Sequence, residues 1–168
     1  MKTFIVLGMH RSATSLAAKG LHMAGIDMGN KLLGAMPSNP YGHFEDRDFI
    51  EMNDQILQAA GGSWDQPPDE DAIFQAGLLL RDRIHDLITE RKKSKRHWGW
   101  KDPRTTLTIR CYLPFLEDPH FIACFRSPEA VARSLAGRER WPVEQCLALA
   151  REYNRRLLGF LEECHPTT

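Results

Sequence analysis

The sequence predicts an α/β fold in which a small parallel sheet is flanked by helices. Two observations carry this prediction. Short, continuous apolar runs, typical of strands covered on both faces, alternate with longer segments in which apolar residues recur at helical spacing. Such alternation is typical of parallel strands joined by helices. The 168 residues, of which 42% are hydrophobic, suffice for one core, so we expect a single domain over residues 1–168.

The chain opens with a strand, a turn and a helix. Residues 4–7, Phe-Ile-Val-Leu, form a continuous apolar run that Gly8 follows at once, as expected for a buried strand. Apolar residues then recur at helical spacing until Gly25 interrupts them; they are Leu16, Ala17, Leu21 and Ala24. Residues 29–45 are rich in Gly, Pro and Asn, which predicts a long loop of the kind that is often functional.

Two helices are predicted in the middle of the chain. The first ends at Gly61-Gly62 and buries one face, made of Phe49, Ile50, Asn53, Ile56, Leu57 and Ala60. The second is a single helix over about 71–92, with Ile73, Ala76, Leu80, Ile84, Leu87 and Ile88 inward. Its basic tail complements the carboxyl end of the helix dipole, so we interpret the tail as a solvated cap and not as a nucleic-acid patch.

Two more strands are predicted, each followed by polar residues. Residues 97–100 are compatible with a strand, and residues 101–106, Lys-Asp-Pro-Arg-Thr-Thr, with a turn. Residues 121–125 form another buried-type strand that ends at Arg126. Because the carboxyl ends of parallel strands meet at one edge of a sheet, we expect the residues after Gly8, Lys101 and Arg126 to form a ligand site.

Two helices complete the predicted fold. Ser127 is a natural N-cap and Pro128 suits the first helical position. A last helix begins near Pro142 and continues to about Leu161, with a stripe of Val143, Cys146, Leu147, Ala150, Tyr153, Leu157, Leu158 and Leu161.

The composition argues against several classes of partner. Lys plus Arg and Asp plus Glu both number 22, so net charge does not favour nucleic acid or an anionic membrane surface. We expect a cytoplasmic protein, because no stretch approaches the roughly 20 apolar residues of a membrane span and no signal-peptide pattern precedes the first strand. The cysteines have no zinc-site spacing and are expected to be buried free thiols; they are Cys111, Cys124, Cys146 and Cys164. We therefore expect no metal site.

The turn after the first strand has the features of an anion site. A glycine after a buried strand permits close backbone approach, and a helix that starts near Thr14 directs unpaired N–H groups to the same place. The nucleoside-triphosphate loop pattern G-x-x-x-x-G-K-[ST] fails, however, because Ala13 stands at its second glycine and Thr14 at its lysine. A purely structural turn with capping hydroxyls remains the alternative reading.

Two segments resemble sulfotransferases that use 3′-phosphoadenosine 5′-phosphosulfate (PAPS). GMHRSATS, residues 8–15, is similar to their 5′-phosphosulfate loop. FRSPEAVARSL, residues 125–135, is similar to their 3′-phosphate segment, in which a serine follows an arginine by eight residues, as Ser134 follows Arg126. NPYGHFEDRDF and WGWKDPRT also resemble segments of bacterial members. The resemblance covers residues 4–161 and implies a P-loop-NTPase-like, three-layer fold.

The resemblance implies a donor site made by both segments. The 5′-phosphosulfate would lie on the first loop, whose implied binding residues are Gly8, His10, Arg11, Ser12, Ala13, Thr14 and Ser15. Arg126 and Ser134 would hold the 3′-phosphate. The family usually has lysine where this chain has Arg11 and glycine where it has Ala13. PAPS would serve as the donor, and no metal would be required.

The resemblance also implies catalytic roles. Arg11 and Lys101 would neutralise charge on the leaving group, and Glu45, in the loop after the first helix, would be the general base. His43 and Asp102 are alternative bases. Glu45 also has the plain reading of a cap for the next helix, and Asp102 that of stabilising its turn.

The expected function is sulfuryl transfer from PAPS to a hydroxyl or amine of a small-molecule or carbohydrate acceptor. Family members usually continue past the long helix into a further strand and a basic, glycine-containing segment, and we expect this domain to lack that part. The alternatives are a non-catalytic module that binds PAPS or adenosine bisphosphate, and a P-loop nucleotide-kinase-like protein.

Overall fold

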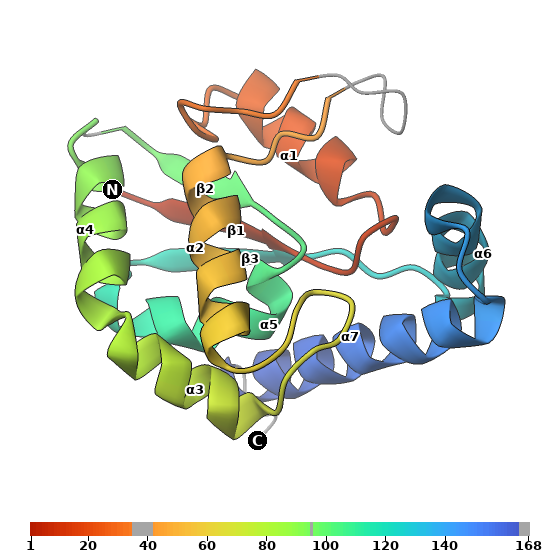
Figure 1. The fold of residues 1–168 in the computed structure, drawn as a ribbon. Coiled ribbons are helices and arrows are strands. Elements are labelled where there is room, and N and C mark those ends of the chain that lie inside the picture. The colour runs from red at the N-terminus through yellow and green to blue at the C-terminus, as the bar shows by residue number, and fades with distance from the viewer. Residues whose placement is uncertain (35–41, 95, 165–168) are drawn as a thin grey trace.

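The computed structural model describes residues 1–34, 42–94 and 96–164, which form three strands and seven α-helices (Figure 1). In chain order these are β1 (Thr3–Leu7), α1 (Thr14–Met23), α2 (Arg47–Ala59), α3 (Glu70–Leu79), α4 (Arg81–Lys92), β2 (Trp98–Lys101), α5 (Thr105–Tyr112), β3 (Pro119–Ala123), α6 (Pro128–Glu139) and α7 (Val143–Cys164), with a short 3₁₀ turn η1 (Leu113–Phe115) after α5.

The strands form one parallel sheet in the order β2-β1-β3. In β1, Ile5 stands opposite Trp100 of β2 and Phe121 of β3. All three carboxyl ends therefore lie at the same edge of the sheet, where a parallel α/β fold places its ligands. The predicted small parallel sheet is confirmed.

The sheet lies between two layers of helices. Val6 points toward α1 and belongs to a small core with Ala18 and Met28. Its neighbours Ile5 and Leu7 belong to the larger core formed with α2 to α7, because successive strand side chains point to opposite faces. Figure 1 shows α1 on one side of the sheet and most helices on the other, as expected of a three-layer α/β fold.

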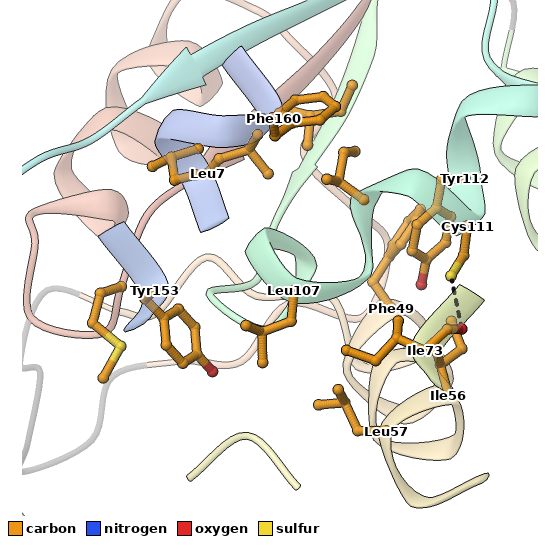
Figure 2. Close-up of a cluster of buried hydrophobic side chains, with 14 of the residues drawn as sticks. Leu7, Phe49, Ile56, Leu57, Ile73, Leu107, Cys111, Tyr112, Tyr153 and Phe160 are labelled. Carbon is orange, nitrogen blue, oxygen red and sulfur yellow. Dashed lines mark hydrogen bonds between the residues drawn. The ribbon is translucent and has the colours of Figure 1, made fainter. Parts of the chain in front are cut away.

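Stacked aromatic rings fill the centre of the larger core. The Phe49 ring lies 4.4 Å from that of Trp100, with 8° between the planes, and Tyr112 packs at the edge of both. Figure 2 shows Phe49 and Tyr112 with Leu7, Leu107 and their neighbours, including the Cys111 thiol directed at the Ile73 carbonyl oxygen. The core therefore joins β2, α2, α3 and α5 behind the sheet edge.

The single helix predicted over 71–92 was wrong, because α3 and α4 are separate helices that meet at Leu80. The apolar pattern continues through the junction, with Ile73 and Ile84 both buried. Both helices pack against α5, and the change of direction lets each do so. Apolar spacing identifies the buried face of a helix, but it does not record a bend between two helices that share that face.

The predicted turn over 101–106 was wrong in part. Lys101 ends β2, and Thr105 already begins α5. Almost the whole of α5 is buried although β-branched residues abound in it. Such residues have modest helix propensity, so tertiary packing decides the conformation here.

The third strand also differs from the prediction, since β3 covers Pro119–Ala123 and not 121–125. Phe125 is 47% exposed, and Arg126 follows the strand by three residues. The ends of the later helices agree better with the sequence. The Ser127 hydroxyl accepts a hydrogen bond from the Ala130 N–H at 3.3 Å, which confirms the N-cap of α6.

The last helix, α7, is confirmed, although Leu158 in its predicted stripe is half exposed. The four cysteines are free thiols, as predicted, but only Cys111 and Cys146 are buried, and Cys124 and Cys164 are partly exposed. Within the described ranges, no helix combines the length and apolar character needed to cross a membrane. Of the predicted loop over 29–45, residues 35–41 lie outside the described part of the chain.

Candidate functional site

A cavity of about 280 Å³ opens at the carboxyl edge of the sheet. It is lined by the loop after β1, the residues that precede α2, the end of β2, and both ends of α6. The lining residues are His10, Arg11, Ala13, Thr14, Ser15, Leu16, His43, Glu45, Lys101, Pro103, Arg126 and Arg138. Four of these side chains are cationic and one is a carboxylate, so a protein without net charge concentrates positive charge here.

The loop from Gly8 to Ala13 turns sharply before α1. Arg11 and Ala13 both adopt the left-handed conformation, with φ of 67° and 65°. This costs a non-glycine residue roughly 1–2 kcal/mol, and such residues cluster at ligand sites. The first N–H groups of α1, which begins at Thr14, have no partner within the helix, and its positive dipole end faces the cavity.

Gly8 and Ser12, both predicted to contact the donor, do not line the cavity. A Cβ on Gly8 would lie 2.6 Å from the carbonyl oxygen of Cys124, the residue after β3. Only glycine therefore lets the chain pass this close to the end of β3. The Gly8 N–H donates to the Thr106 hydroxyl at 2.8 Å. Ser12 is buried beneath the loop, and its hydroxyl has no hydrogen-bond partner among the described residues.

The two predicted donor segments are in direct contact. Arg126 donates from Nη1 to the Arg11 carbonyl oxygen at 2.9 Å. Arg11 in turn donates from Nε to the Ser134 hydroxyl at 2.9 Å. Arg11 and Arg126 line the cavity, whereas Ser134 lies behind Arg11. Burial, followed by the positive charges of Arg138 and Arg126, lowers the pKa of Arg11.

Lys101 and Glu45 form a buried ion pair that also lines the cavity. The Lys101 Nζ lies 2.5 Å from the Glu45 Oε1, and it also donates to the Ser15 hydroxyl and the His43 carbonyl oxygen, both at 3.2 Å. Lys101 is 2% and Glu45 6% exposed. The cap of α2 is Asp46, whose carboxylate accepts from the Asp48 N–H at 3.0 Å. Of the two acids, the helix therefore uses Asp46, and Glu45 faces the cavity.

Asp102, an alternative base by sequence, points away from the cavity into a buried polar network. Its carboxylate accepts from Asn53 Nδ2 at 2.8 Å and from the Arg104 N–H at 3.2 Å, which is the turn-stabilising role. We call this network the buried hub; its members are Asn53, Asp102, Arg104, Thr105, Thr108 and Tyr112. Burial is the main cause that raises the pKa of Asp102.

Burial favours the neutral form of both histidines of the cavity. Burial, then the positive charge of Arg138, lowers the pKa of His10 well below its usual value. Its ring packs on Trp64 with centroids 4.6 Å apart, and within the described chain its buried Nε2 has no hydrogen-bond partner. Burial also lowers the pKa of His43, whose Nδ1 lies 4.0 Å from Glu45. Neutral imidazoles can accept or donate a hydrogen bond without adding charge.

Sequence reasoning missed three lining residues, namely Leu16, Pro103 and Arg138. Leu16 is part of the helical apolar pattern but is 71% exposed at the cavity rim. Arg138 follows Ser134 by four residues, and this spacing places both on one face of α6. This spacing could have identified Arg138 from the sequence, because the resemblance already assigns Ser134 to the ligand.

Within the described ranges, no group of three or more His, Cys, Asp and Glu side chains could hold a metal ion. Comparison of the chain with protein-family models, with curated proteins and with solved structures found no match. The assignment of a function therefore has to rest on the residues and their geometry.

Proposed function

We propose that the protein transfers a sulfuryl group from PAPS to a hydroxyl or amine acceptor. The observation that carries the proposal is the meeting of Arg11, Lys101 and Arg126 in one cavity with Glu45. A donor with several phosphate and sulfate charges needs focused cations and exposed N–H groups. The loop before α1 offers both, and the resemblance of its residues to a phosphosulfate loop supports this donor over other anions.

In the proposed reaction the cations of the cavity act on the leaving group, and its carboxylate acts on the acceptor. The acceptor oxygen or nitrogen forms a bond to sulfur while the sulfur–oxygen bond to the 5′-phosphate breaks, and adenosine 3′,5′-bisphosphate leaves. Arg11 and Lys101 neutralise the charge that develops on the departing phosphate. Glu45 takes the proton of the acceptor.

The Lys101–Glu45 pair fits this division and also limits it. Lys101 contacts the loop through Ser15 and the carboxylate through Glu45. A lysine that contacts both the donor loop and the base can shift toward the leaving phosphate and stabilise the negative charge that develops there. The contact also occupies the Glu45 carboxylate, however, because the Lys101 Nζ lies 2.5 Å from its Oε1 and an acceptor has to displace it.

That contact favours a second candidate, a module that binds adenosine bisphosphate or PAPS without turnover. The two candidates differ only in whether Glu45 becomes available to an acceptor. Both require the donor site, and they are separated by measuring binding and turnover on the same preparation.

The test is transfer of radiolabelled sulfate from PAPS to a broad panel of hydroxyl and amine acceptors. Glu45→Gln should lower turnover by about 10²–10⁴-fold, the usual range for loss of a general base, while binding of adenosine 3′,5′-bisphosphate is retained. Glu51→Gln, at an exposed carboxylate on α2, is the matched control and should keep full activity. Tight bisphosphate binding without turnover on any acceptor would reject the enzyme and leave the binding module.

A further inference from the structure

Arg138 is the cation of the cavity to which neither predicted donor segment assigns a role. It lies near the carboxyl end of α6, one turn after Ser134, whose hydroxyl accepts from Arg11. Residues four apart share a helix face, and Arg138 lines the cavity with Arg11 and Arg126. Three arginines, from the loop and from both ends of α6, thus line the same cavity.

The side chain of Arg138 is supported from behind. Its guanidinium carbon lies 5.9 Å from the centre of the Trp64 ring, a favourable cation–π distance. Trp64 in turn packs at a tilt against His10 and stacks on Trp141. Arg138 is 22% exposed, so its stem is ordered by packing while its head reaches the cavity.

Part of the hydrogen-bonding capacity of Arg138 is unused. Its Nε donates to the carboxylate of Glu139. Among the described residues no other hydrogen bond of this guanidinium occurs, which leaves the donors on its two terminal nitrogens. Glu139 does not line the cavity, so it offsets the charge of Arg138 from outside.

Like charges gathered in this way repel one another. The charge of Arg138 contributes, after burial, to the lowered pKa of Arg11 and of His10, so it acts at both positions. A phosphate group, with oxygens that accept several hydrogen bonds and a double negative charge, would relieve this repulsion. A carboxylate or a sulfate ester, each with a single negative charge, would relieve less of it.

We propose that Arg138 is a third phosphate-binding arginine of the cavity and contacts a phosphate of the donor together with Arg11 and Arg126. This inference rests on the proposed function for the identity of the donor. That Arg138 binds a phosphate group does not depend on that identity. It adds a binding residue from the carboxyl end of α6 to the two predicted segments.

The test is calorimetric titration of adenosine 3′,5′-bisphosphate and of inorganic pyrophosphate into the full chain. Arg138→Gln should weaken both ligands roughly tenfold, as expected for a charge-assisted hydrogen bond at a partly exposed site. Arg133→Gln, at an exposed arginine of the same helix, should leave both affinities unchanged. A melting curve verifies that each variant folds.

A second variant changes affinity in the opposite direction. Glu139→Gln releases Arg138 from its competing carboxylate, so it should tighten both ligands by about two- to fivefold, as expected for a weak, partly exposed ion pair. A purely structural Arg138–Glu139 pair predicts no gain, so this variant tests the inference even if Arg138→Gln does not fold.

The outcomes separate the inference from the proposed function. The inference would be overturned if Arg138→Gln bound both ligands with wild-type affinity, or if Glu139→Gln gained no affinity. It would also be overturned if Arg138→Gln changed only the turnover of an anionic acceptor, because Arg138 would then bind the acceptor and not the donor. Pyrophosphate binding that depends on Arg138, without binding of the bisphosphate, would uphold the inference and contradict the donor. A wild-type chain that binds neither ligand would overturn both.

Discussion

Lys101 and Asp102 are adjacent at the carboxyl end of β2, yet they belong to two polar regions of opposite character. Lys101 faces the cavity, where cations outnumber anions. Asp102 faces the buried hub, where most donors have an acceptor, although the Arg104 Nε has no hydrogen-bond partner among the described residues. Asn53 alone donates to Asp102 and Thr105 and accepts from Thr108 and Tyr112, all at 2.7–3.0 Å. Two adjacent charged residues therefore serve different purposes.

The difference teaches how a structural polar network can be told from a ligand site. A buried network that satisfies every member stabilises one arrangement of the chain. A cavity that gathers like charges is unfavourable by itself, and it becomes favourable only when an anion enters. The two regions touch through α5, because Thr106 accepts from Gly8 of the loop. Substitutions in the hub should lower stability, whereas those in the cavity should lower binding.

The largest effect on stability should come from Asn53→Ala in the buried hub. The substitution removes four buried hydrogen bonds, and it leaves Tyr112 without its hydroxyl partner and the other partners with fewer bonds. Each unsatisfied group costs about 1–3 kcal/mol, and partial relaxation should bring the total to roughly 3–5 kcal/mol. Chemical denaturation measures the free energy of unfolding.

The control for this prediction is Gln58→Ala, at an exposed position of the same helix, which should change stability by less than about 0.5 kcal/mol. If Asn53→Ala were as stable as the wild type, the hub would not be the stabilising region that its hydrogen bonds indicate.

A smaller effect, on binding, is expected for Arg126→Ala in the cavity. If Arg126 holds the 3′-phosphate, adenosine 3′,5′-bisphosphate should bind roughly tenfold more weakly, and adenosine 5′-phosphate should be little affected. The contact between Arg126 and the Arg11 carbonyl sharpens this test. Equal losses for the two ligands in calorimetric titrations would mean that Arg126 only supports the 5′ loop.

The smallest effect should be a change in pH dependence, where the two regions have opposite signs. Because the pKa of His10 is lowered, the unfolded chain binds this proton more readily, so stability is lost as the pH falls from about 6.5 through the folded pKa. The pKa of Asp102 is raised, so the stability linked to its protonation is present at low pH and is lost as the pH rises through that pKa.

His10→Phe tests the cavity side of this contrast, since it keeps a ring against Trp64 and removes the titration. The free energy of unfolding should fall less steeply between about pH 6.5 and 5 than in the wild type, with a residual slope from His43. His22→Gln, at an exposed position on α1, should retain the wild-type slope. An unchanged slope in His10→Phe would show that His10 titrates as in the unfolded chain.

Local patterns in the sequence were sufficient for much of the fold. A continuous apolar run located β1 and overlapped β3, and Ser127 with Pro128 marked the start of α6, because strands and caps depend on residues close in the sequence. The parallel arrangement also predicted that Arg11, Lys101 and Arg126 would converge, since the ends of parallel strands share one edge. The cavity brings them together.

Contacts between distant segments determined the remainder. The bend at Leu80 and the helix that begins at Thr105 arise where α3, α4 and α5 pack together, and short-range propensity does not report such packing. The choice of Glu45 for the cavity and Asp46 for the cap, like the opposite directions of Lys101 and Asp102, depends on which partner lies on each side of the chain. By itself, the sequence determined which chemical groups reach the sheet edge. Only the tertiary structure decided which of them face the cavity, because burial and partners come from residues far apart in the chain.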